Sequence, residues 1–328
     1  MAFQVLLSRV INFSRIITGY FLSVLIRRPV NWGFPLAVSI EPNNTCNLRC
    51  PECPSGVNEL TRSRGNMGYP RFVSILDQLS PALAYLTLYF QGEPYLNPSF
   101  FDFIHYARSR KIFVSASTNG HFLGEENIRK TVESGLDRLI ISLDGPDQES
   151  YSAYRVGGNF RQVLQGIRSL VDEKHRVGSR NPKIILQCLI LRSNENRLKE
   201  IRKLGKELGV DKVVFKTAQF NDYQQGHPMM PENRKYSRYY QVEKKSPEFK
   251  IKNPLPNRCF RMWSGCVFTW DGKVVPCCFD KDAQHILGDL NSHTFAEIWK
   301  SGPYQMFRGK ILKNRKSIPI CTNCTQTK

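Results

Sequence analysis

The strongest constraint on the fold is a regular alternation of short β-rich runs with longer amphipathic stretches between residues 36 and 217. The strand-like runs are 36–41, 85–90, 112–118, 139–144, 184–191 and 212–215, and the helical patterns between them are 71–80, 98–110, 125–134, 159–172 and 196–208. Strands of this length separated by helices of roughly 10–15 residues are typical of βα units around a parallel sheet. About six units are present, fewer than the eight of a closed barrel. The sequence therefore predicts an open α/β arrangement.

The remaining regions have a different character. Residues 218–258 are polar and rich in Pro, Lys and Tyr, which predicts a linker or substrate-covering loop. Beyond them, Asp271-Gly272 inside VFTWDGKVV predicts a hairpin with a two-residue turn. We expect an N-terminal amphipathic helical segment (1–35), a barrel (36–217), the linker or loop (218–258) and a small cysteine-rich α+β domain (259–328).

The ten cysteines are clustered rather than scattered. Three lie near the start (Cys46, Cys50, Cys53), six lie in the last quarter (Cys259, Cys266, Cys277, Cys278, Cys321, Cys324), and Cys188 stands alone in an apolar strand that predicts a core position. Disulfide frameworks are typical of short secreted domains, whereas tight cysteine spacing in a larger chain without a signal peptide favours metal. We therefore expect metal sites.

The first cluster has the spacing Cys46-x3-Cys50-x2-Cys53, directly after the first predicted strand. Three thiolates can hold three irons of a cubane cluster and leave the fourth iron open. An open position is where a cosubstrate can bind. The alternative is a zinc knuckle, but zinc normally takes a fourth protein ligand and no His or Cys follows nearby.

Motif, position and fold pattern together resemble the radical S-adenosylmethionine (SAM) superfamily, whose signature is Cx3Cx2C after the first strand of a partial (β/α)6 TIM-like barrel. The resemblance implies a 4Fe–4S cluster held by Cys46, Cys50 and Cys53. It also implies reductive cleavage of SAM to a 5′-deoxyadenosyl radical, which abstracts hydrogen from a substrate, and a reducing partner such as a flavodoxin or ferredoxin. One position departs from the family: Glu52 stands where an aromatic residue usually precedes the third cysteine. We expect altered packing beneath the cluster, not its loss.

The resemblance also implies a SAM-binding set. Its members are Gly92, Glu93, Pro94, Ser117, Asn119, Ser142 and Arg155, and no catalytic acid or base is predicted. The first three match the family's GEP element, the next three lie at strand ends that face the active site of a parallel barrel, and Arg155 is expected to pair with the SAM carboxylate. Alternatives stay open: a Gly-Pro turn with a solvated acid, helix caps or turn residues, and a surface arginine.

The C-terminal cysteines resemble the SPASM or twitch extension of one radical SAM branch. The resemblance implies one auxiliary 4Fe–4S cluster held by Cys259, Cys277, Cys321 and Cys324, because full SPASM domains continue with further cysteines and this chain ends four residues later. Cys277 is preferred to Cys278 because it follows Pro276 at the family's spacing, which leaves Cys266 and Cys278 as buried thiols. A zinc ribbon is the alternative.

The formal charge of +19 fits an anionic partner, a membrane surface or good solubility. The alternative function is a zinc-binding RNA-binding protein, favoured weakly by this charge and by Tyr236, Tyr239 and Tyr240. A plain electron carrier is disfavoured by the three-cysteine site and the GEP element. Nucleic acid is not the expected partner either, because the same three-cysteine site and GEP element resemble those of a SAM enzyme.

The N-terminal 28 residues predict an amphipathic helix. One side carries Gln4, Ser8, Arg9, Asn12, Arg15, Gly19 and Ser23, and another carries Phe3, Leu6, Val10, Phe13, Ile17, Tyr20 and Val24. Only Ile16–Ile26 is uncharged, which is too short to span a bilayer, and no signal peptide is visible. We expect a cytoplasmic protein whose apolar helix face either packs on the barrel or binds the inner face of an anionic membrane through Arg9, Arg15, Arg27 and Arg28.

The substrate is left open among a small molecule, a lipid-linked molecule and a peptide. Only about 35 residues precede the barrel, which leaves no room for a domain that recognises a leader peptide. Small molecules, or short peptide segments recognised without a leader, are therefore favoured.

Overall fold

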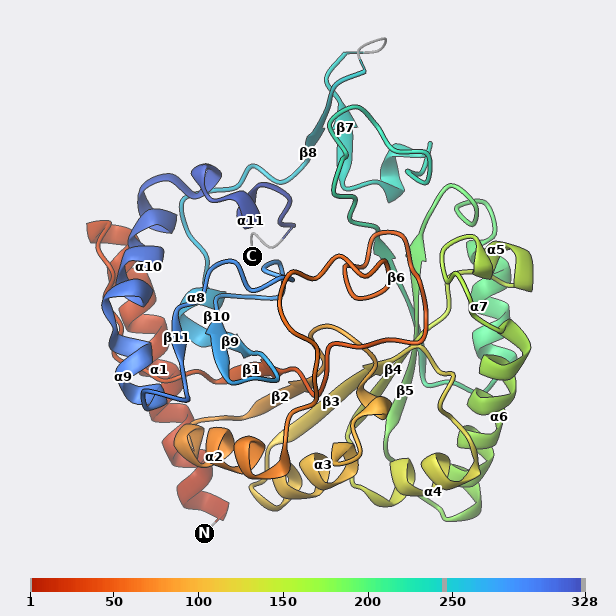
Figure 1. Cartoon of the computed structure of the whole chain (residues 1–328), viewed down its shortest axis with the longest axis horizontal. Helices are drawn as coiled ribbons and strands as arrows, with labels where there is room; N and C mark the ends of the chain where they lie inside the picture. Colours follow the sequence, from red (N-terminus) through yellow and green to blue (C-terminus); the bar gives the residue numbers. More distant parts are fainter. Residues whose placement is uncertain (1, 244–246, 326–328) are drawn as a thin grey trace. The chain divides into compact units, whose positions relative to one another are not determined.

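Every strand predicted between residues 36 and 217 is present in the computed structural model, which describes residues 2–243 and 247–325. The chain divides into two units. Figure 1 labels the helices and strands of both. Unit one comprises residues 1–44, 60–114 and 253–328, and unit two comprises residues 45–59 and 115–252.

Unit one is built on strands in the order β11-β10-β9-β1-β2, followed by the first residues of β3. Their bounds are β1 Ala37–Ile40, β2 Tyr85–Leu88, β3 Phe113–Thr118, β9 Gly265–Phe268, β10 Lys273–Val275 and β11 Gly288–Asp289. β1 pairs in parallel with both β2 and β9, whereas β10 is antiparallel to β9 and β11. The C-terminal cysteine-rich segment therefore extends the sheet that begins with β1.

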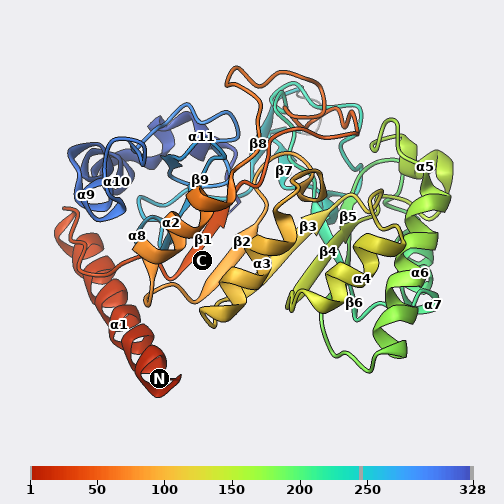
Figure 2. The same cartoon turned by 60° about the horizontal axis from the view of Figure 1, so that its bottom comes forward.

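The helices of unit one are α1 (Ala2–Ile26), α2 (Tyr69–Leu79), α3 (Phe100–Ser109), α8 (Arg261–Ser264), α9 (Phe295–Lys300), α10 (Gly302–Asn314) and α11 (Pro319–Thr322), with 3-10 turns η1 (Pro94–Leu96) and η3 (Arg315–Ser317). Helices α2 and α3 lie side by side (Figure 2), and Phe72 stacks on Phe103 with ring centroids 4.3 Å apart. Thr294 and Glu297 form a capping box that starts α9. These contacts fix the helices that accompany β1 and β2.

Unit two contains four parallel strands in sequence order: β3, β4 (Arg138–Ser142), β5 (Lys183–Ile190) and β6 (Lys212–Thr217). The helices are α4 (Glu125–Glu133), α5 (Gln148–Ser152), α6 (Phe160–Arg176) and α7 (Leu198–Glu207). Asn159 caps the start of α6, because its side chain accepts a hydrogen bond from the Gln162 amide, and the helix buries Val163, Ile167 and Leu170 along one side. The strand series ends at β6 here and at β11 in unit one, so the mostly parallel α/β sheet is open, as predicted.

The described residues of 218–258 contain the 3-10 turn η2 (Arg234–Tyr236) and the antiparallel strands β7 (Tyr239–Gln241) and β8 (Phe249–Ile251), and a linker or substrate-covering role for this segment stays a prediction. One local expectation is wrong. The hairpin after Cys266 does form, but Phe268 pairs with Val274, which leaves four residues between the strands rather than two. Gly272 takes φ +91° in that loop, where a glycine is favoured.

Helix α1 also differs from expectation. Over Phe3–Ile26 it is the one helix in the described part of the chain that is long and apolar enough to cross a membrane, so length alone does not exclude spanning. The alternative in which its apolar side packs on the protein is wrong for the first half of the helix, because Phe3, Leu6, Val10 and Phe13 are exposed.

Candidate functional site

The loop that carries the first three cysteines is held by its own backbone in unit two. The Cys53 amide donates to the Cys50 carbonyl at 3.1 Å, and the Gly56 and Val57 amides donate to the Cys53 carbonyl at 2.8 and 3.0 Å. A Cβ on Gly56 would lie 2.8 Å from the Cys50 amide nitrogen, so only glycine allows this close turn. All three cysteines lie on this loop as thiols, outside any disulfide.

Two polar side chains of unit two reach the thiols. The Asn119 amide Nδ2 lies 3.6 Å from the Cys46 Sγ and donates to the Asn47 Oδ1 at 2.7 Å. The Arg155 Nη1 lies 3.7 Å from the Cys50 Sγ. Burial raises the pKa of the Cys50 thiol, and the Arg155 guanidinium opposes that rise. The guanidinium thus favours the thiolate, which is the form that binds metal.

Arg155 is anchored by a buried acid and is not the surface arginine of the alternative interpretation. Its Nε lies 2.5 Å from the Asp144 Oδ2, and Asp144 is fully buried. The Leu189 amide donates to the Asp144 Oδ1 at 2.6 Å. Burial acts to lower the pKa of Arg155, but Asp144 and Cys50 outweigh it and raise that pKa. Sequence reasoning missed this pair, although an acid just after β4 was the available signal.

The strand-end polar residues of unit two are also in place. Ser117 lies in β3, and Ser142 ends β4 and is buried. Asn119 has a turn function as well, because its Oδ1 accepts from the His121 amide at 3.0 Å. The turn alternative therefore holds for Asn119 alongside its contact with Cys46.

The Gly92-Glu93-Pro94 element lies in unit one after β2. Gly92 has φ +73°, which favours glycine there. Glu93 is 2% exposed, so the solvated acid of the alternative interpretation is wrong. Its carbonyl accepts from the Asn43 Nδ2 at 2.7 Å, and its side chain accepts from the Tyr95 amide at the start of η1.

Glu52, the departure from the family pattern, binds the segment that follows β6. Its Oε2 accepts from the Asn221 amide at 2.8 Å, and its Oε1 lies 3.1 Å from the His227 Nε2. The His227 ring stacks on Phe220 at 4.3 Å. Leu48 and Cys50 pack in the same apolar cluster as Phe220. The altered packing beneath the cysteines is therefore a polar clamp between the loop and residues 220–227.

The C-terminal cysteines of unit one surround one cavity. Cys259, Cys277, Cys321 and Cys324 line it, together with Arg261 and Arg315. The Arg315 Nη2 lies 3.2 Å from the Cys324 Sγ. Burial raises the pKa of Cys321 to about 11, and Arg315 opposes that rise. The set of four is thus gathered around a common space with a cation beside it.

The other cysteines lie outside this cavity. Cys278 is exposed, contrary to expectation, and accepts from the Arg261 Nη1 at 2.9 Å. Cys266 and Cys188 are buried, as predicted. Among the described residues, no three His, Cys, Asp or Glu side chains already converge closely enough to hold a metal ion. The argument that iron-sulfur clusters fit these sites therefore rests on the type of donor. Soft thiols lie together on one loop in unit two and around one cavity in unit one.

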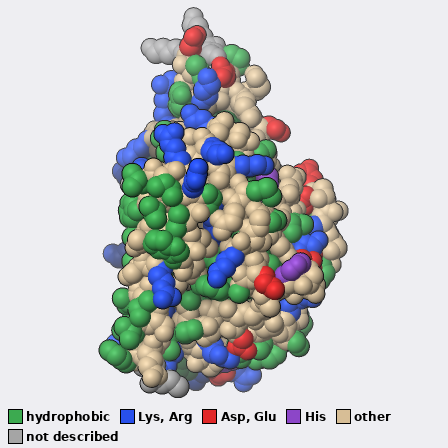
Figure 3. Space-filling model, turned by 90° about the vertical axis from the view of Figure 1, so that its left-hand side faces the viewer, with side chains coloured by type: hydrophobic (Ala, Val, Ile, Leu, Met, Phe, Trp, Pro, Cys, Tyr) green, Lys and Arg blue, Asp and Glu red, His purple; other side chains and the backbone are tan. Residues whose placement is uncertain are grey.

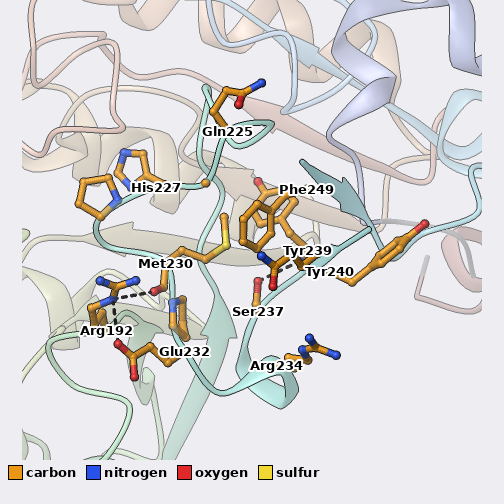
Figure 4. A pocket seen from close by; sticks show the side chains of 14 residues that line it. Arg192, Gln225, His227, Met230, Glu232, Arg234, Ser237, Tyr239, Tyr240 and Phe249 are labelled. Atoms are coloured by element: carbon orange, nitrogen blue, oxygen red, sulfur yellow. Dashed lines mark hydrogen bonds and ion pairs between the residues drawn. The ribbon is translucent and has the colours of Figure 1, made fainter. Parts of the chain in front are cut away.

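A separate pocket of about 550 Å³ lies within unit two and is lined mostly by residues of the 218–258 segment (Figure 4). Arg192, His227 and Tyr239 are among its lining residues. Arg192 donates to the Met230 carbonyl at 3.2 Å and lies 3.8 Å from Glu232. Tyr239 is buried against Tyr223 at 4.4 Å, so this ring belongs to the core rather than to an aromatic RNA-binding surface.

Comparison with known families agrees with this geometry. The radical SAM superfamily model matches residues 40–204, and the SPASM iron-sulfur cluster-binding domain model matches residues 259–325. The chain belongs to the radical SAM superfamily and carries a C-terminal SPASM domain. The family implies SAM and a 4Fe–4S cluster as cofactors, and the SPASM domain implies auxiliary iron-sulfur clusters.

Individual relatives are distant but match most of the chain. The tungsten-containing aldehyde ferredoxin oxidoreductase cofactor-modifying protein of Pyrococcus furiosus is 27% identical, covering 87% of this chain and 86% of its own. The PqqA peptide cyclase of Gluconobacter oxydans is 24% identical, covering 84% and 79%. The solved structure of Streptococcus suis SuiB bound to S-adenosylmethionine has a TM-score of 0.64 at 15% identity, covering 84% and 68%, which supports the fold alone. This chain is an enzyme of the superfamily.

We predict that Glu52→Ala loosens residues 220–227. The change leaves the Asn221 amide and His227 without their acceptor, which costs about 1–3 kcal/mol for such partly buried groups. Hydrogen–deuterium exchange of the full chain should show faster exchange at 220–227. The exposed Glu59→Ala on the same loop is the matched control and should leave that exchange unchanged. Equal exchange in both variants would show that the clamp contributes nothing.

Proposed function

We propose that this enzyme reductively cleaves SAM at a 4Fe–4S cluster bound by Cys46, Cys50 and Cys53, and abstracts hydrogen from its substrate. The observation that carries the proposal is the single loop with three cysteine thiols, two of which are contacted by Asn119 and Arg155. Such a set suits a cubane cluster with one open iron. When bound, cluster and SAM supply the electron transfer and the 5′-deoxyadenosyl radical; the protein supplies binding and orientation.

The chain's own residues have distinct tasks in this proposal. Arg155, held by Asp144, offsets the negative charge of a thiolate-bound cluster and is available to a carboxylate of SAM. Asn119 orients the Cys46 thiol. The remaining positions proposed for SAM binding, on the family motif, are Gly92, Glu93, Pro94, Ser117 and Ser142.

We further propose that Cys259, Cys277, Cys321 and Cys324 bind one auxiliary 4Fe–4S cluster. These four thiols share a cavity, and the guanidinium of Arg315 beside Cys324 would offset the charge of a four-thiolate cluster. Cys278 lies outside the cavity, which supports the choice of Cys277. A fully ligated cluster of this kind can relay an electron or orient the substrate.

The substrate stays a prediction. The relatives' names include a cofactor-modifying protein and a peptide cyclase, so they do not select among a small molecule, a lipid-linked molecule and a peptide. A flavodoxin or ferredoxin as electron donor and a cytoplasmic location complete the proposal. The alternative of a zinc-binding RNA-binding protein has less support, because the family matches are to iron-sulfur enzymes and Tyr239 is buried.

Cys50→Ala is expected to abolish SAM cleavage, because two thiolates cannot hold the cluster with its open iron in place. The measurement is dithionite-dependent 5′-deoxyadenosine formation by the anaerobically reconstituted protein. Cys188→Ala, which removes a buried thiol from β5 in the same unit, is the control and should retain cleavage. A full yield of 5′-deoxyadenosine from Cys50→Ala would refute the proposed site.

Cys324→Ala is expected to separate the two sites. About four irons per chain should be lost, since a cubane cluster holds four, while uncoupled SAM cleavage persists. Product formation should fail once a substrate is known. The matched control is Cys278→Ala, whose exposed thiol lies outside the cavity and whose iron content should equal that of the wild type. Unchanged iron in Cys324→Ala would remove this residue from the ligand set.

A further inference from the structure

Helix α1 packs within unit one through Ile16 and Tyr20 together with polar and small residues, while most of its other large apolar residues stay exposed. Its buried positions include Asn12, Ile16, Gly19 and Ser23, which recur at three- and four-residue steps. A Cβ on Gly19 would lie 3.0 Å from the Val30 carbonyl oxygen, so the close approach favours glycine. Most of the large apolar side chains of this amphipathic helix therefore face away from the protein, unlike those of a helix that covers a soluble core.

Specific hydrogen bonds hold this orientation. The Asn12 side chain donates to the Phe34 carbonyl at 2.9 Å and accepts from the Phe34 amide at 2.8 Å. The Ser23 hydroxyl accepts from the Val30 amide at 2.8 Å and lies 3.0 Å from the Val30 carbonyl. Tyr20 packs edge-on against Trp263, with ring centroids 5.5 Å apart. The helix therefore cannot rotate to bury its apolar side without losing these bonds.

The outward side of α1 is strongly apolar. Its exposed members are Phe3, Leu6, Leu7, Val10, Ile11, Phe13, Phe21, Leu25 and Ile26, each 43–80% exposed, and Trp32 beyond the helix is 54% exposed. Figure 3 shows that hydrophobic side chains gather in patches on this side of the molecule, with Lys and Arg side chains nearby. A contiguous patch of this kind on a soluble protein marks an interaction surface.

The charge beside this apolar side selects an anionic occupant. Arg15, Arg27 and Arg28 are exposed, and no acid precedes Glu41 in the sequence. A two-fold dimer through this helix would bring the same cationic segment against itself with no acid of that segment to pair it. An anionic lipid surface offers both an apolar layer and negative charge.

The structure also distinguishes lying on a membrane from crossing it. Crossing would place Arg9 and Arg15 inside the apolar layer. It would also break the hydrogen bonds that the Asn12 and Ser23 side chains make with the backbone groups of Phe34 and Val30. Remaining attached to unit one, the helix can insert only its outward side.

We propose that α1 docks this protein onto the surface of an anionic lipid bilayer. The apolar side from Phe3 to Ile26 enters the boundary between headgroups and acyl chains, and Arg15, Arg27 and Arg28 contact lipid phosphates. The inference does not depend on the proposed SAM chemistry.

The test is co-sedimentation of the full chain with phosphatidylcholine vesicles that contain or lack phosphatidylglycerol. Wild type should bind the anionic vesicles much more tightly, and binding should weaken as salt rises. Arg15→Gln/Arg27→Gln/Arg28→Gln should bind on the order of 100-fold more weakly, as roughly fivefold per charge implies. Leu6→Gln/Val10→Gln/Phe21→Gln should abolish binding. The control Val177→Gln changes an exposed apolar residue in the other unit and should bind like wild type.

Circular dichroism and iron content must match wild type in every variant, which separates loss of docking from loss of folding. Wild type that stays in the supernatant with anionic vesicles would overturn the proposal. Equal binding to neutral and anionic vesicles would overturn it too. So would sedimentation velocity showing a vesicle-free dimer that the Leu6→Gln/Val10→Gln/Phe21→Gln variant dissociates, because the occupant would then be a second copy.

Discussion

The buried ion pair between Asp144 and Arg155 organises the cysteine loop of unit two. Asp144 follows β4, accepts from the amide of Leu189 in β5, and fixes the guanidinium that reaches Cys50. Val156, which follows Arg155 in the sequence, accepts a hydrogen bond through its carbonyl from the amide of Arg49 in the cysteine loop at 2.9 Å. Removing one partner of such a buried pair typically costs about 3–5 kcal/mol, because the other charge is left uncompensated. The Asp144 carboxylate therefore holds both the end of β5 and the Arg155 guanidinium that contacts the cysteine loop.

The same chemistry recurs at the C-terminal cysteines of unit one. Arg315 lies beside Cys324, and Arg261 lies beside Cys278. Burial raises the pKa of the Cys321 thiol, and the Arg315 guanidinium opposes that rise and so favours the thiolate that a metal requires. Part of the positive charge of the chain thus lies beside its cysteines. In the membrane proposal, the N-terminal arginines place another part at the surface that contacts anionic lipid.

Sequence periodicity predicted the strands well because each βα unit carries its own apolar pattern; β4, for example, was expected at 139–144 and lies at Arg138–Ser142. Helix α2 starts earlier than expected, at Tyr69, because Pro70 fits the first helical turn. The clamp of Glu52 with His227 joins distant segments and leaves no local pattern. The side of α1 that faces the protein is set by hydrogen bonds from Asn12 to the Phe34 backbone and from Ser23 to the Val30 backbone. The amphipathic pattern of the sequence does not reveal these bonds.

The central claim is that seven cysteines bind two cubane clusters, one of which cleaves SAM. Anaerobic reconstitution, followed by metal analysis and a SAM-cleavage assay on the same sample, tests it most directly. The account predicts about eight irons per chain, as two four-iron clusters require, together with 5′-deoxyadenosine that forms only with a reductant. Stoichiometric zinc at either set of cysteines, or iron without SAM cleavage, would contradict it.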